Sequence, residues 1–130
     1  MDFVDANVFW WWLGGGKCKQ YLSCQADAGT EFATSFFVLA ELYMAMTASG
    51  KSRAEAEEWV LRISSLPNLV LVDVDWNCFS RAMSVAVECG LDFFDSLHAA
   101  VCLEKGVRLA TFDKHFQKVP GLKTFAPALD

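Results

Sequence analysis

The chain has 130 residues, of which 54% are hydrophobic and 21% are charged. This length and composition predict one domain, residues 1–130, with a single buried core, and they exclude a disordered chain. The net charge of −5 argues against a protein that grips nucleic acid by bulk positive charge. It leaves room for an enzyme that meets phosphates through bound divalent cations, or for a basic protein partner.

Two further classes are excluded by the apolar residues and the cysteines. No apolar run reaches the roughly 18 residues of a membrane span, and no secretory leader is visible. The five cysteines are an odd number at scattered spacings without a CxxC pair, which indicates reduced thiols rather than a disulfide framework or a zinc site. We therefore expect a cytoplasmic protein that does not enter a membrane.

The predicted elements begin with a short apolar strand that ends on Asp5. Asn7 is the expected N-cap of the helix that follows, and the glycines at 14–16 end it. Three consecutive tryptophans, residues 10–12, cover most of the circumference of this helix, so they cannot all face one core. Either they pack in the ordinary way against neighbouring elements, or at least one lies on a second helix, on a partner or at the lip of a groove.

The rest of the chain alternates between short apolar runs and segments of helical period. In the first half of the chain we expect strand 2–5, helix 9–13, a loop or helix at 19–24, strand 31–33, helix 36–48 capped by Thr34 or Ser35, and helix 52–65 opened by a capping box at Ser52. In the second half we expect strand 69–74 buried on both faces, helix 76–89 capped by Asp75 with Phe79, Ala82, Met83 and Ala86 inside, and helix 95–104 started by Asp92 or Asp95. Strand 107–111, a short helix at 113–116 and strand 122–125 complete the chain. This alternation predicts an α/β fold with a central, mainly parallel sheet of four or five strands and helices on both faces.

Four acidic side chains are placed near one edge of that sheet. Asp5 and Asp113 each follow a strand, and the carboxyl ends of parallel strands meet at one edge. Asp95 lies at the start of a helix that reaches the same edge. Glu41 lies about two turns into a helix among apolar neighbours, where an unpaired charge is costly to bury.

A cluster of carboxylates needs something to offset its repulsion. Two unit charges about 4 Å apart repel by roughly 4 kcal/mol at an effective dielectric constant of about 20. No Lys or Arg adjoins Asp5, Glu41 or Asp95 in the sequence, and only Lys114 adjoins Asp113. All-oxygen ligation favours Mg²⁺ or Mn²⁺. The alternative is that these acids are helix caps and surface charges, since the chain has 16 acidic residues; the residues alone leave both open.

Four segments together resemble the motifs of PIN domains. They are Val4-Asp5-Ala6-Asn7-Val8, residues 35–42 with Glu41, residues 91–100 with Asp95, and residues 109–116 with Asp113. Each motif is short, but the four stand in the family's order over nearly the whole chain. The resemblance implies a PIN-like three-layer α/β/α sandwich and a metal-dependent endoribonuclease.

By the same resemblance, Asp5, Glu41, Asp95 and Asp113 are the catalytic residues and surround one or two Mg²⁺ or Mn²⁺ ions. Asn7 and Thr111 orient the carboxylates by hydrogen bonds. The compact length looks most like VapC-type toxins, which implies an RNA substrate, a homodimer and a cognate antitoxin protein. An RNA-processing nuclease without an antitoxin and a non-catalytic PIN-fold binding module remain alternatives.

Other readings fit the residues less well. A haloacid-dehalogenase phosphatase places a second Asp two residues after the first, where this chain has Asn7, and a receiver domain needs a Lys motif that is missing. His98 follows Asp95 by one helical turn, which resembles a metal-ligand spacing, but we expect a packed histidine. Asp92, Lys114 and His115 are expected to be ordinary loop charges.

Overall fold

A fully parallel sheet of five strands forms the centre of the molecule. The computed structural model describes residues 1–24 and 27–130, and of residues 25 and 26 only their helical backbone. The strands lie in the order β3-β2-β1-β4-β5, and every adjacent pair is parallel. They are β1 (Asp2–Val4), β2 (Phe32–Thr34), β3 (Leu69–Leu71), β4 (Arg108–Ala110) and β5 (Thr124–Phe125). The predicted α/β fold with a parallel sheet is confirmed.

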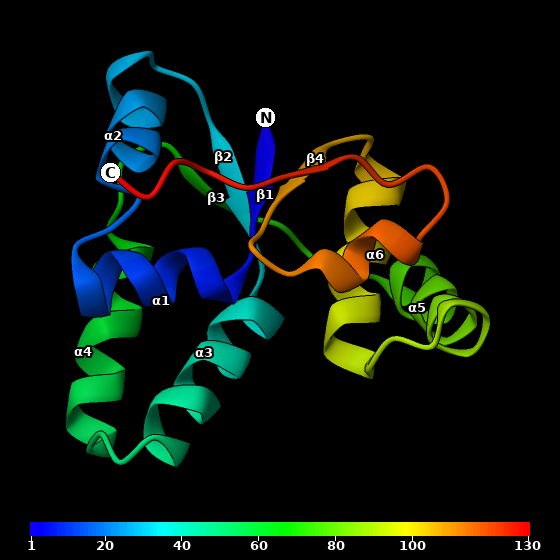
Figure 1. Ribbon diagram of the computed structural model, residues 1–130, viewed down its shortest axis with the longest axis horizontal. Coiled ribbons are helices and arrows are strands. Elements are labelled where there is room, and N and C mark those ends of the chain that lie inside the picture. Colours follow the sequence, from blue (N-terminus) through cyan, green and yellow to red (C-terminus); the bar gives the residue numbers. More distant parts are fainter.

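Helices cover both faces of this sheet. They are α1 (Ala6–Gly15), α2 (Lys19–Asp27), α3 (Phe36–Ala48), α4 (Arg53–Ser64), α5 (Trp76–Cys89) and α6 (Phe93–Lys105), with a 3₁₀ helix η1 (Lys114–Lys118). Figure 1 shows α5 and α6 on one side of the strands and the α1 to α4 group on the other. This is the three-layer α/β/α arrangement. Within the described residues no helix is long and apolar enough to cross a membrane.

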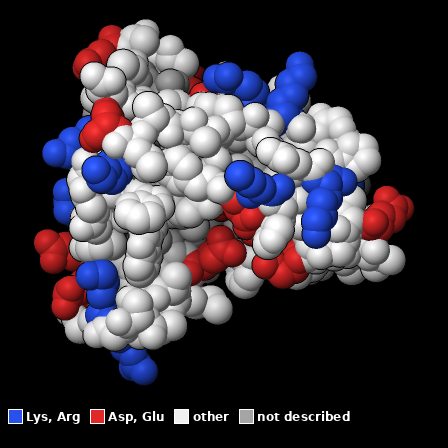
Figure 2. Space-filling view, viewed as in Figure 1, with Lys and Arg blue, Asp and Glu red and all other residues white. Residues whose placement is uncertain are grey.

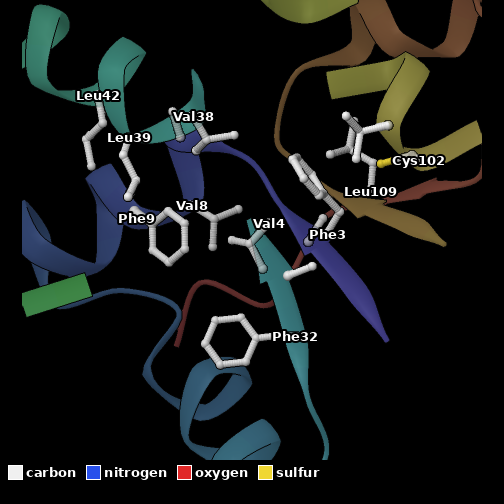
Figure 3. Packing of buried hydrophobic residues seen from close by; sticks show 14 of the residues in the cluster. Phe3, Val4, Val8, Phe9, Phe32, Val38, Leu39, Leu42, Cys102 and Leu109 are labelled. Atoms are coloured by element: carbon white, nitrogen blue, oxygen red, sulfur yellow. The ribbon is translucent and has the colours of Figure 1, made fainter. Parts of the chain in front are cut away.

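The central strand β1 is buried on both faces. Phe3 points toward Cys102 of α6 and Leu109, whereas Val4 points to the opposite side, toward Val8 of α1 (Figure 3). Phe3, Val4 and Val8 have no exposed surface. Alternate side chains of a strand face opposite sides, so two apolar neighbours suffice to anchor both helical layers.

The pairing of β1 with β4 sets the position of the functional edge. Val4 pairs with Ala110, and the backbone N–H of Asp5 continues the ladder by donating to the carbonyl of Ala110 at 3.0 Å. Asp5 and Thr111, which directly follow this pair, are therefore brought side by side at the carboxyl edge of the sheet.

Several sequence predictions about the elements are wrong in detail. Asp5, not Asn7, caps α1, because the Asp5 backbone is extended and its side chain accepts from the N–H of Ala6. The strand expected over 69–74 is only β3, and it is half-buried because it forms the sheet edge. Helix α6 starts at Phe93 rather than at Asp95; of its two predicted starting residues the structure uses Asp92 as the cap, which leaves Asp95 in the first turn.

Helix α5 buries a different stripe from the one predicted. Its core residues are Cys78, Ala82 and Val85, whereas Met83 is 42% exposed. The caps predicted at Ser52 and Asp75 are confirmed, and of the two candidates at the start of α3 the structure uses Ser35.

Candidate metal and active site

A pocket of about 320 Å³ opens at the carboxyl edge of the sheet, between α1, α3 and the start of α6. All four predicted acids line it. Its lining is Asp5, Ala6, Asn7, Trp10, Glu41, Leu42, Ala45, Asp92, Asp95 and Asp113. Figure 2 shows acidic side chains gathered in a hollow of this face, with basic side chains on the surface above them.

Asp5 is the most buried of these acids, at 4% exposure. Its Oδ1 accepts a hydrogen bond from the backbone N–H of Ala6 at 2.8 Å, and its Oδ2 accepts from Thr111 Oγ1 at 2.7 Å. Burial raises the pKa of Asp5 above its ordinary value, although these hydrogen bonds and the nearby His98 act in the opposite direction. The carboxylate is thus fixed in orientation but is short of compensating positive charge.

Thr111 connects Asp5 to the rest of the rim. Its Oγ1 accepts from Asn7 Nδ2 at 3.2 Å and from the backbone N–H of Asp113 at 3.1 Å, while its own proton goes to Asp5. Asn7 in turn accepts from the backbone N–H of Phe112 at 3.3 Å. Thr111 therefore bonds the Asp5 carboxylate directly, whereas Asn7 bonds Thr111 and the Phe112 backbone and none of the carboxylates in these contacts.

Glu41 is paired with a histidine from the facing helix. His98 Nε2 lies 3.2 Å from Glu41 Oε1 and 3.9 Å from Asp5 Oδ1, and His98 is only 1% exposed. Burial alone would lower the pKa of His98, but the hydrogen bond to Glu41 and the charges of Asp5, Glu41 and Asp95 raise it above its ordinary value. The expected packed histidine does pack against Phe3, with ring centroids 6.1 Å apart, but it also gives Glu41 the partner that the sequence did not show.

Asp92 and Asp95 lie together at the N-terminus of α6. Asp92 Oδ1 accepts from the backbone N–H of Asp95 at 2.8 Å. Burial, followed by the charges of Asp92, Asp5 and Glu41, raises the pKa of Asp95 to about 7. Glu41, Asp92 and Asp95 each offer a carboxylate oxygen within 4.8 Å of the others. Asp92, expected to be a loop charge, is therefore part of the acidic cluster.

Asp113 occupies the rim of the pocket and is less closely associated with the other acids. It caps η1, where its Oδ1 accepts from the backbone N–H of His115 at 2.8 Å, and the His115 ring nitrogen Nδ1 lies 3.2 Å from the same oxygen. Among the described residues, the two closest groups of metal-type ligands are Asp5 with Glu41 and His98, and Glu41 with Asp92 and Asp95. Glu41 is common to both groups.

These residues fit a hard divalent cation. In the described part of the chain, the Arg ion pairs are Arg81–Glu104 and Arg108–Asp2, and no Lys or Arg pairs with an acid of the pocket. Burial raises the pKa of both Asp5 and Asp95, and the charges of neighbouring acids raise them further, so a bound cation would stabilise the ionised carboxylates. Carboxylate oxygens in this number are the ligands that Mg²⁺ and Mn²⁺ prefer.

Sequence reasoning missed two other contributors to the site. His98 carried a signal, because it follows Asp95 by three residues and so shares a helix face with it. Trp10 follows Asn7 by the same interval, but the run of three tryptophans does not say which one faces the acids. The structure selects Trp10, which lines the pocket.

Comparison with known proteins agrees with this architecture. The family model for the PIN domain matches residues 3–122. A search of curated proteins found no match.

Several solved structures share the fold. A VapBC2 structure from Rickettsia felis, bound to a DNA fragment from its promoter, matches with a TM-score of 0.77 and 19% identity over 95% of this chain and 96% of that chain. A DNA-bound VapBC from Salmonella typhimurium matches with a TM-score of 0.75 and 15% identity, covering 97% and 98%. VapC20 of Mycobacterium tuberculosis, described as a Sarcin-Ricin loop cleaving toxin, matches with a TM-score of 0.67 and 23% identity, covering 98% and 100%. At these identities the likeness shows the fold alone.

Proposed function

The chain belongs to the PIN domain family, and we propose that it is a Mg²⁺- or Mn²⁺-dependent endoribonuclease. One observation carries the proposal: five carboxylates line a single pocket at the carboxyl edge of the sheet, without a paired Lys or Arg among the described residues. Such a pocket repels a bare phosphate and becomes a phosphate site only when a cation is bound.

The acidic side chains of the pocket are the proposed ligands of the cation. Asp5, Glu41 and Asp95 are the proposed ligands, with Asp92 and Asp113 on the rim. A bound Mg²⁺ or Mn²⁺ would polarise the scissile phosphate and lower the pKa of an attacking water. In-line attack of water on the scissile phosphate leaves a 3′-hydroxyl on one product and a 5′-phosphate on the other.

The groups behind the ligands keep them in place. Thr111 holds one oxygen of Asp5 and the backbone N–H of Asp113 through hydrogen bonds, and Asn7 donates a hydrogen bond to the Thr111 hydroxyl. Such supporting contacts typically matter about 10- to 100-fold for metal affinity or activity. His98 holds Glu41 from the side of α6, so that Glu41 stays at the pocket when no cation is bound.

We further propose that the protein is the toxin of a toxin–antitoxin pair, held inactive by a cognate antitoxin and dimeric in solution. The likeness to VapBC structures over nearly the full length of both chains supports this assignment, as does the likeness to M. tuberculosis VapC20, a Sarcin-Ricin loop cleaving toxin. Co-expression with the protein of a neighbouring small gene tests it. Relief of growth inhibition supports an antitoxin, and unchanged inhibition favours an RNA-processing nuclease.

The nuclease activity itself is tested with purified protein and a structured RNA. Cleavage is expected with Mg²⁺ or Mn²⁺ and is expected to stop in EDTA. Asp5→Asn removes the central charge but keeps the shape of the side chain, so it should abolish cleavage while the circular dichroism spectrum is unchanged. Asp73→Asn, at an exposed acid outside the pocket, is the matched control. Cleavage that resists EDTA, or full activity of Asp5→Asn, contradicts the proposed metal-dependent mechanism. An absence of cleavage with either cation favours the non-catalytic PIN-fold binding module.

A further inference from the structure

The pocket that holds the acids also has an apolar part. Beyond the carboxylates and Asn7 its lining is Trp10, Leu42 and Ala45, with Ala6 beside Asp5. Trp10 lies five residues after Asp5 on α1, which is about 7.5 Å along a helix axis, and Ala45 lies one turn after Glu41 on α3. The pocket is therefore acidic at one end and apolar at the other. A nucleotide is divided in the same way, with a charged phosphate at one end and a flat, largely apolar base at the other.

Trp10 is the aromatic side chain of this apolar end, and its ring packs against a second aromatic ring from α4. It makes an edge contact with Trp59 of α4, with ring centroids 6.4 Å apart and an interplanar angle of 70°. Trp59 also makes a cation–π contact with Lys51, whose Nζ lies 4.6 Å from the ring centroid. A ring that is positioned in advance loses little conformational freedom when a ligand stacks on it.

The other two tryptophans of the run have different surroundings. Trp11 is 45% exposed and does not line the pocket. Trp12 packs on Arg62 of α4, whose guanidinium carbon lies 5.6 Å from the ring centroid. Successive residues of a helix point about 100° apart, so only one of the three can face the acids. That residue is Trp10, which follows Asn7 by three positions on the same face.

We propose that Trp10 is the platform on which one unpaired nucleobase next to the scissile phosphate stacks. This inference rests on the proposed nuclease function and narrows its substrate class to RNA whose base at that position is free to leave a duplex, as in a single strand or a loop. Stacking on an aromatic ring tolerates all bases, because every base has a π face. Trp10 therefore provides affinity and position for the strand, and it does not read a sequence.

The test compares intact RNA with RNA that lacks one base. The substrates are a short single-stranded RNA cleaved by the wild type and a series in which one nucleotide at a time is abasic. For the wild type, loss of the base next to the cleaved bond should lower kcat/KM by about 5- to 100-fold. Trp10→Ala should lower kcat/KM on intact RNA by a similar factor and should show no additional loss on the abasic substrate. Trp10→Phe should keep most of the activity, since a phenyl ring also stacks.

Trp11→Ala is the matched control, because it removes the same side chain from the same helix outside the pocket. Its kcat/KM should equal that of the wild type on every substrate. Urea unfolding of each variant shows whether any loss follows from instability. Equal losses in Trp10→Ala and Trp11→Ala, or an abasic effect that is as large in Trp10→Ala as in the wild type, overturn the proposal.

A binding measurement separates this inference from the nuclease function. With Mg²⁺ present, 5′-AMP should quench part of the tryptophan fluorescence of the wild type and of Trp11→Phe, and this quench should be lost in Trp10→Phe. If no RNA is cleaved but the quench behaves in this way, the nuclease function fails and Trp10 is still a base platform. If RNA is cleaved but the quench is the same in all three proteins, the nuclease function stands and the stacking role of Trp10 is wrong.

Discussion

Asp95→Asn should stabilise the protein when no divalent cation is present. The pKa of Asp95 is raised from 3.8 to about 7, first by burial and then by the charges of Asp92, Asp5 and Glu41. A carboxyl with a raised pKa binds its proton more tightly in the folded state than in the unfolded state. The free energy of unfolding therefore falls as the pH rises from about 4 to about 7, and it stays at the lower level above pH 7.

The size of this effect follows from the shift and from the position of the side chain. The rise of the Asp95 pKa from 3.8 to about 7 corresponds to an upper limit of about 4 kcal/mol in the free energy of unfolding. Asp95 is partly exposed, so solvent screening reduces this to about half or less. Asn also loses the favourable interaction of a negative charge with the N-terminus of α6, about 0.5 kcal/mol. The expected gain for Asp95→Asn is therefore about 1 to 2 kcal/mol at pH 8.

Urea unfolding in EDTA at pH 4, 6 and 8 measures this gain. The advantage of Asp95→Asn over the wild type should be near zero at pH 4, intermediate at pH 6 and largest at pH 8. Asp73→Asn, at an exposed acid, should differ from the wild type by no more than about 0.5 kcal/mol at every pH. An Asp95→Asn variant that is no more stable than the wild type at pH 8, or whose advantage is independent of pH, would show that neither burial nor the neighbouring acids destabilise the charged form of Asp95.

Three other measurements examine the cation and the supporting contacts. Mg²⁺ at one hundred times its Kd should add about 2.7 kcal/mol to the free energy of unfolding of the wild type, and much less to that of Asp5→Asn; equal gains in both would place the cation elsewhere. Thr111→Val should lower cleavage by about 10- to 100-fold whereas Thr111→Ser, which keeps the hydroxyl bonded to Asp5 at 2.7 Å, should remain close to the wild type. Tyr21→Phe removes the 2.8 Å hydrogen bond to Asp2 and should lower the free energy of unfolding by about 1 kcal/mol. Cleavage should not change, because this contact lies at the opposite end of β1 from Asp5. A loss of activity at unchanged stability would contradict this expectation.

The fold was predictable wherever a local signal decides the structure. The N-caps at Ser52 and Asp75 follow from side chains that accept from the backbone N–H three residues later, and this depends on neighbouring residues alone. The misplaced cap at Asn7 has a tertiary cause. Asp and Asn are both good N-caps, so the residue types of Asp5 and Asn7 do not decide between them. The backbone hydrogen bond from Asp5 to Ala110 keeps Asp5 in an extended conformation, and the helix therefore starts directly after Asp5. The prediction that β3 is buried on both faces failed for a similar reason, because an apolar run does not indicate whether its strand lies at the centre or the edge of the sheet.

The candidate site was predictable in its acids but not in their partners. Asp5 follows β1 and Asp113 follows β4, and these two strands pair in parallel. Because both strands run in the same direction, the residues that follow them lie at the same edge of the sheet. The contact between Glu41 and His98 depends on how α3 and α6 approach each other across that edge, which no local pattern encodes. This contact matters for the argument from charge. Glu41 looked unpaired in the sequence, whereas in the fold it shares a buried histidine with Asp5.

The two ends of the pocket depend on the fold in different ways. At the acidic end, the register of β1 against β4 places Asp5 beside Thr111, and the hydroxyl of Thr111 joins Asp5, Asn7 and the backbone of Asp113. This geometry follows from the pairing of β1 with β4 rather than from the packing of helices on one another. The apolar end depends on side-chain packing between α1 and α4, where the ring of Trp10 contacts the ring of Trp59. A change at Trp59 should therefore alter how strands bind while leaving the carboxylates in place, and Trp59→Ala is expected to raise KM for RNA more than it lowers kcat. A fall in kcat at unchanged KM would mean that the helix layer positions the acids as well.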